Sequence, residues 1–140
     1  MVKDLKHRFT EDLEKNQNII HKVCRAYTTS DSAHKDLFQE ITIQLWRAYP
    51  KFRGDSKFST WAYRVALNTA ISLYRKSKRQ IETSEIYDNL KELEFKDYDD
   101  EKDQQVKLLY KAIRQLSDIE KALCLLYLDD KSYKEISKTL

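Results

Sequence analysis

One long amphipathic segment near the middle of the chain, KFSTWAYRVALNTAISLYRKSK (residues 57–78), carries the clearest structural signal in the sequence. Its apolar residues recur at intervals of three and four, which is the spacing of one face of an α-helix. We therefore predict a helix from about Lys57 to Lys78, with Ser56 or Asp55 as its N-cap and Gly54 in the turn before it. The apolar set comprises Phe58, Trp61, Ala62, Val65, Leu67, Ala70, Ile71 and Tyr74.

The same periodicity extends over both flanks of this segment. It predicts helices over about residues 5–27 and 36–49 before it, and further helices between residues 108 and 140 after it. The 140 residues include one glycine and one proline, which leaves little material for the tight turns of β-hairpins. The predicted fold class is therefore all-α.

Several classes of protein are excluded at this stage. No apolar run approaches the roughly 18 residues of a membrane span, and the N-terminus has no apolar signal core, so we expect a cytoplasmic protein without membrane insertion. Cys24 and Cys124 have no second Cys or His at ligand spacing, so we expect no metal and no cofactor. No paired carboxylates, nucleophile–base pair or phosphate loop stands out, so we expect no enzyme.

Charge is distributed unevenly along the chain, although its net value is only +3. Residues 51–79 hold eight basic residues and one acid, whereas residues 80–104 hold ten acids and three basic residues. A basic block followed by an acidic one is typical of a polyanion-binding unit and a solvated linker. We therefore expect two small helical domains, residues 1–79 and 105–140, joined by an acidic linker over residues 80–104.

The C-terminal segment carries two capping boxes, one at Ser117 and Glu120 and one at Ser132 and Glu135. Short helices joined by residues 129–131 are typical of the start of a helix-turn-helix. The sequence ends where the second helix of that motif is expected. The prediction for this segment is therefore an incomplete helix-turn-helix.

Aromatic, basic and amide side chains alternate along residues 52–71. Proteins bind single-stranded nucleic acid with this combination, because rings stack on unpaired bases while Lys and Arg follow the phosphates. The basic run over residues 75–79 adds phosphate contacts. The alternative is that Phe58, Trp61 and Val65 are core and the basic run is a solvated face. Composition alone favours that alternative, because aromatic stripes usually pack.

The order of the residues, unlike their composition, favours the nucleic-acid-binding interpretation. Residues 36–79 resemble the second conserved region of bacterial sigma factors of the small extracytoplasmic-function (ECF) type. The matching residues are Asp36, Gln39, Glu40, Phe52, Gly54, Ser56, Phe58, Thr60, Trp61, Tyr63, Arg64, Ala66, Asn68, Ala70, Ile71 and Arg75. Residues 114–140 are similar to the opening of the family's fourth region, through Leu116, Ser117, Glu120, Lys121, Leu126, Tyr127, Glu135 and Ile136.

The resemblance implies an alternative sigma factor, which recruits core RNA polymerase to specific promoters and helps to open the duplex. Asp36, Gln39, Glu40 and Gln44 form one polar stripe, and the matching helix of the family docks on a coiled coil of the polymerase β′ subunit. The element that matches residues 58–79 melts the minus-ten promoter element and captures its non-template strand. The DNA-binding residues expected there are Phe58, Trp61, Tyr63, Arg64, Asn68, Arg75, Lys76, Lys78 and Arg79.

Within that set, Asn68 is the favoured base reader, because an amide can pair with a base edge through two hydrogen bonds. The resemblance also implies an anti-sigma factor as a partner, and a recognition helix beyond Leu140, so we expect a chain that is truncated relative to a full family member. Two alternatives stay open: a DNA-binding transcriptional regulator that does not bind polymerase, and a helical domain whose partner is another protein. The polar stripe from Asp36 to Gln44 distinguishes a sigma factor from the first alternative, because a regulator that does not bind polymerase has no need of the stripe.

Overall fold

The computed structural model describes residues 2–54, 57–81, 101–129, 131 and 133–139. This part of the chain forms seven α-helices and one short 3-10 helix, with no strand, so the predicted all-α fold class is confirmed. The elements are α1 (Val2–Lys15), α2 (Gln17–Tyr27), α3 (Asp31–Ala48), η1 (Tyr49–Lys51), α4 (Phe58–Ile81), α6 (Glu101–Ile113), α7 (Asp118–Leu128) and α8 (Tyr133–Thr139).

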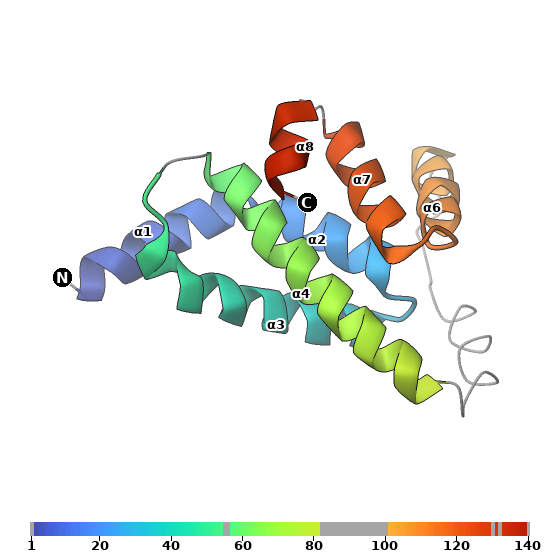
Figure 1. Cartoon of the computed structure of the whole chain (residues 1–140), viewed down its shortest axis with the longest axis horizontal. Coiled ribbons are helices and arrows are strands. Elements are labelled where there is room, and N and C mark those ends of the chain that lie inside the picture. The colour runs from blue at the N-terminus through green and yellow to red at the C-terminus, as the bar shows by residue number, and fades with distance from the viewer. Residues whose placement is uncertain (1, 55–56, 82–100, 130, 132, 140) are drawn as a thin grey trace.

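The helices are arranged in layers around α2 and α4. Figure 1 shows α3 on one side of this pair, and α7 and α8 on the other. Both α2 and α3 pack along α4, whereas α7 contacts α2 and α4 and α8 contacts α4 and α7. Helix α4, which contains the segment that decides the fold, is therefore covered on two sides and open on a third.

The buried core explains this arrangement. Ile20, Ile41, Leu45 and Leu67 are completely or almost completely buried, and each such side chain contributes about 1.5–3 kcal/mol relative to an exposed one. On α4 the buried positions include small residues four apart, and small contact residues let neighbouring helices approach closely. These residues are Ala62, Ala66 and Ala70.

Local signals explain where the helices begin and end. The hydroxyl of Ser30 accepts a hydrogen bond from the backbone N–H of Ala33 at 3.2 Å and so caps the start of α3. Pro50 follows α3 within η1, since proline cannot continue the hydrogen-bond ladder of a helix. Gly54 has φ of 76°, in the left-handed region that glycine adopts without strain, as expected for the turn before α4.

The C-terminal helices share the core of the N-terminal ones. Ser117 and Glu120 form the predicted capping box at the start of α7, whereas Ser132, from the second predicted box, lies outside the described residues. Leu125 and Leu126 of α7, together with Ile136 of α8, belong to the same buried cluster as the residues of α2, α3 and α4.

The domain boundaries stay a prediction, as does the incomplete helix-turn-helix. Helix α4 continues to Ile81 and α6 begins at Glu101, so most of the predicted linker at residues 80–104 lies outside the described residues. None of the helices described is both long and apolar enough to cross a bilayer. Within the same residues, no three His, Cys, Asp or Glu side chains come together as metal ligands.

Candidate nucleic-acid interface

The open side of α4 presents a polar stripe. Arg64, Asn68 and Arg75 are all exposed, and their spacing of four and seven residues places them on one face of the helix. Lys76 is exposed beside them. The structure thus brings together four of the predicted DNA-binding residues on one surface.

Two further predicted residues lie at the C-terminal end of α4. Lys78 and Arg79 are within the helix, but their side chains lie outside the described residues. Cations at this end suit the helix dipole, whose negative pole lies at the C-terminus.

The aromatic residues before the stripe pack against each other. The ring centroid of Trp61 lies 4.9 Å from that of Phe52 and 5.5 Å from that of Phe58. Tyr49 completes the cluster, with its centroid 6.2 Å from that of Trp61. Since Phe58 and Trp61 are half-buried, these rings hold the turn around Gly54 against α4 and leave only part of their surface for a base.

Tyr63 lies elsewhere, and the prediction for it needs a correction. Its side chain is fully buried, and its hydroxyl donates a hydrogen bond to the carboxylate of Asp129 in the C-terminal segment. Burial raises the pKa of Tyr63, and the hydrogen bond to Asp129 raises it further. In this arrangement Tyr63 is inaccessible to DNA, because it points from α4 toward the interior while Arg64, one residue later, points outward.

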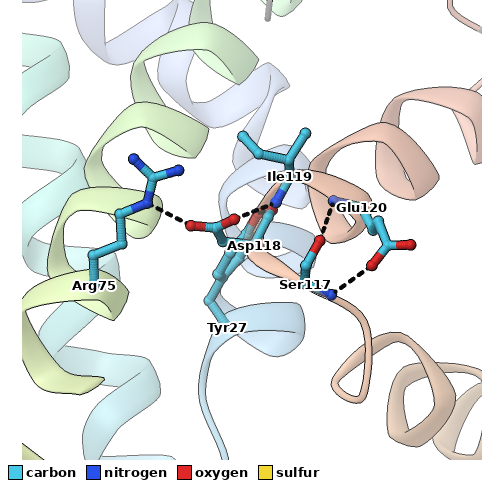
Figure 2. Close-up of polar contacts among 6 residues, drawn as sticks. All are labelled: Tyr27, Arg75, Ser117, Asp118, Ile119 and Glu120. Carbon is cyan, nitrogen blue, oxygen red and sulfur yellow. Dashed lines mark hydrogen bonds and ion pairs between the residues drawn. The ribbon is translucent and has the colours of Figure 1, made fainter. Parts of the chain in front are cut away.

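Arg75 is exposed but engaged. Its Nε donates to Oδ2 of Asp118 at 2.5 Å, and Figure 2 shows this pair at the start of α7. The other oxygen of Asp118 accepts a hydrogen bond from the backbone N–H of Ile119 at 2.7 Å. The hydroxyl of Tyr27 donates to the backbone carbonyl of Asp118 at 2.5 Å. The backbone N–H of Ile119 therefore orients the carboxylate that holds Arg75, and Tyr27 of α2 holds the backbone of Asp118.

The second predicted surface lies on α3. Asp36 and Gln39 are exposed, and Glu40 and Gln44 are half-buried, with Nε2 of Gln44 donating to Oε1 of Glu40 at 3.0 Å. Ile43 lies on the same face and is 43% exposed. A central apolar side chain surrounded by polar ones is typical of a protein interface.

Comparison with known proteins matches the N-terminal half of this fold to a family. The model of sigma-70 region 2 matches residues 13–80, which span α2, α3 and most of α4. This stretch belongs to the sigma-70 region 2 family.

About three quarters of the chain is similar to ECF-type sigma factors. It is 32% identical over 117 residues to the RNA polymerase sigma-H factor of Pseudomonas aeruginosa, a match that covers 76% of this chain and 61% of the relative. It is 34% identical over 113 residues to the ECF RNA polymerase sigma-E factors of Escherichia coli K12 and Salmonella typhimurium LT2, covering 73% of this chain and 59% of each relative. The chain thus spans about three-fifths of the length of these relatives. No solved structure matches it.

Sequence reasoning missed two features of the region 2 domain. Ile43 continues the spacing of Asp36 and Glu40 along α3, and this periodicity was the signal that could have added it to the polar stripe. The engagement of Arg75 and Tyr63 by Asp118 and Asp129 had no such signal, because the partners lie 43 and 66 residues away along the chain.

Proposed function

We propose that the chain acts as an alternative sigma factor, which brings core RNA polymerase to specific promoters and opens the minus-ten element. The observation that carries this proposal is the match of residues 13–80 to sigma-70 region 2, combined with the exposed polar stripe on α4. The names of the related proteins support RNA polymerase as a partner, and the exposed basic residues of α4 support DNA as the other.

On the DNA side, the proposed ligand is the non-template single strand. Arg64, Arg75 and Lys76 follow the phosphates, and Asn68 lies between them where an amide can read a base edge. Phe58 and Trp61 contribute the exposed part of their rings, and Lys78 and Arg79 add two positive charges to the sequence near the end of α4.

On the protein side, the proposed ligand of the α3 face is the β′ coiled coil of core polymerase. Asp36, Gln39, Glu40 and Gln44 supply polar contacts, and Ile43 supplies a central apolar one. We also infer an anti-sigma factor as a partner and the cytoplasm as the site of action, since sigma factors work on polymerase there. The role is regulatory, without covalent chemistry.

The rival function is a DNA-binding regulator that never contacts polymerase. Both candidates use the basic stripe of α4, but only the sigma factor uses the α3 face. Titration of labelled core polymerase with this chain distinguishes them, because the rival has no affinity to measure.

The matched variants make that titration specific. Asp36→Lys with Glu40→Lys reverses two charges on the α3 face, and Glu11→Lys with Glu14→Lys reverses two exposed charges on α1. We expect the α3 pair to weaken polymerase binding at least tenfold and the α1 pair to leave it within twofold. Equal effects of the two pairs would remove the α3 face from the proposal.

A further inference from the structure

One tyrosine organises the turn between α3 and α4. Tyr49 lies in η1 and is buried. Its ring centroid lies 6.2 Å from those of Phe52 and Trp61, and 6.3 Å from that of Phe58. The backbone carbonyl of Tyr49 also accepts a hydrogen bond from the N–H of Phe52 at 2.9 Å. Tyr49 therefore contacts the start of the turn through its backbone and the rings on both sides of the turn through its side chain.

Helix α1 holds this tyrosine from the other side. The hydroxyl of Tyr49 donates to Oδ2 of Asp12 at 2.8 Å, and the ring centroid of Phe9 lies 5.1 Å from that of Tyr49. Phe9 and Asp12 are three residues apart, so both side chains lie on one face of α1. The side-chain amide of Asn16 donates to the backbone carbonyl of Asp12 at 2.7 Å and so ties down the end of α1 that carries the carboxylate. Helix α1 thus gives the ring of Tyr49 one apolar and one polar contact.

The tip of the turn, in contrast, is open. Gly54 has φ of 76°, and apart from its neighbours in the chain no described atom lies within 4 Å of the point where a Cβ would sit. Lys51 and Arg53, which precede it, are exposed. The arrangement of the rings beside this turn therefore depends on the contacts at its base, where Tyr49 lies.

The hydrogen bond between Asp12 and Tyr49 joins two parts of the chain that the family comparison treats differently. The match to sigma-70 region 2 covers residues 13–80, so Phe9 and Asp12 precede it, whereas Tyr49 and Trp61 lie within it. The match therefore assigns no role to the contacts that α1 makes with Tyr49.

We propose that Tyr49, held by Asp12 of α1, is a positioning residue for capture of the unpaired strand; this inference rests on the proposed function. Phe58 and Trp61 are half-buried, so each offers a base only part of its ring. Stacking on a base depends on how that part is oriented, and Tyr49 packs against both rings. Without the hydrogen bond to Asp12, the ring at position 49 can shift, and the rings that it contacts shift with it. The strand then loses stacking while the phosphate contacts of the α4 stripe are unchanged.

Variants of the full chain separate this role from a loss of stability. Tyr49→Phe and Asp12→Ala each remove the hydrogen bond, whereas Asp12→Asn keeps a side-chain oxygen that can accept it. The double variant Tyr49→Phe with Asp12→Ala tests whether the two changes act through the same bond. Ile41→Val is the control for stability alone, because Ile41 is completely buried in α3 and the change removes core volume without removing a ring contact.

Two measurements are made on each variant. All of them, and the parent chain, carry Trp46→Phe, so that Trp61 is the one tryptophan left in the sequence. Acrylamide quenching of the Trp61 fluorescence measures the exposure of that ring without DNA. Fluorescence anisotropy with labelled single-stranded oligonucleotides, one with a matched minus-ten sequence and one scrambled, measures binding.

We expect Tyr49→Phe and Asp12→Ala each to raise the quenching constant of Trp61 at least 1.5-fold and to weaken binding of the matched oligonucleotide at least threefold. The double variant should lose no more than either single variant. Asp12→Asn should restore both readouts to near the parent values, and Ile41→Val should leave both within 1.5-fold of the parent.

The inference is overturned if Tyr49→Phe binds the matched oligonucleotide as tightly as the parent or as Ile41→Val does, and also if the two losses add in the double variant. A parent chain that binds neither oligonucleotide overturns the proposed DNA contact and this inference with it. A parent that binds while Tyr49→Phe matches it overturns this inference alone and leaves the proposed function standing.

Discussion

The hydroxyl of Tyr63 offers a direct test of the contact between α4 and the C-terminal segment. Tyr63→Phe removes one hydrogen bond from a fully buried ring and leaves the volume of the ring almost unchanged. A hydrogen bond to a charged group contributes about 1.5–3 kcal/mol of stability. Asp129 keeps its contact with Lys22 at 2.6 Å in this variant, so the carboxylate is not left unpaired and the lower half of that range applies.

We therefore expect the free energy of unfolding to fall by about 1.5–2 kcal/mol, which for a chain of this size lowers Tm by about 4–8 °C. Urea unfolding at pH 7, followed by circular dichroism, measures the free energy of unfolding. Tyr127→Phe is the matched control, because Tyr127 is 64% exposed. The control should change the free energy of unfolding by less than 0.5 kcal/mol, the usual range for surface substitutions.

A double-mutant cycle tests whether the stability lost in Tyr63→Phe comes from the hydrogen bond between Tyr63 and Asp129. If Tyr63 and Asp129 interact as the structure shows, Tyr63→Phe costs less in the Asp129→Asn background than in the wild type, with a coupling of about 1 kcal/mol. A Tyr63→Phe variant as stable as Tyr127→Phe would refute this reasoning, and so would a coupling near zero.

Three further predictions test the core, the pH dependence and the DNA stripe. Ile41→Ala should lower the free energy of unfolding by about 2–5 kcal/mol, because Ile41 is completely buried, whereas Ile43→Ala two residues later should cost less than 1 kcal/mol in the same urea titration. Burial, and then the nearby charge of His21, lowers the pKa of His34 below 6.5, so the unfolded chain takes up a proton first as the pH falls. The free energy of unfolding should therefore decrease as the pH drops below 6.5, and His34→Asn should flatten that decrease. Asn68→Ala should reduce the preference for a matched over a scrambled oligonucleotide, whereas Arg75→Ala should lower affinity for both and weaken the salt dependence, as measured by anisotropy at several salt concentrations.

The helices could be predicted from the sequence, because the patterns that indicate a helix are local. The apolar spacing of residues 57–78 predicts α4, which the structure extends to Ile81, and the capping box at Ser117 predicts the start of α7. Capping and periodicity depend on neighbours within a few residues, so both can be read from one chain.

The exposed stripe on α4 could be predicted only in part from the sequence. Spacing alone separates Tyr63 from Arg64, since consecutive residues of a helix point about 100° apart. The resemblance to sigma factors predicted both as DNA-binding residues, and in the structure only Arg64 is exposed. Similarly, composition favoured packing for Phe58 and Trp61, and in the structure both are half-buried and their rings contact each other.

The packing of the C-terminal helices against α2 and α4 could not be predicted from the sequence. Among the described residues, Asp118, Asp129 and Glu135 place carboxylates in contact with α4, and no local pattern in the sequence pairs any of them with that helix. Lys22 and Asp129 are 107 residues apart along the chain. Such pairs depend on how whole helices pack, and no local pattern encodes that.

The proposed function has this chain bring core RNA polymerase to specific promoters and hold the minus-ten element in its open form. The most direct measurement is abortive transcription by core polymerase on two templates, one with a minus-ten element that is already melted and one fully duplex. We expect the chain to stimulate short transcripts from the melted template. Asp36→Lys with Glu40→Lys should abolish the stimulation, and Glu11→Lys with Glu14→Lys should preserve it. A core enzyme that binds the chain but makes no additional transcripts from the melted template, or equal stimulation by both variants, would contradict the account.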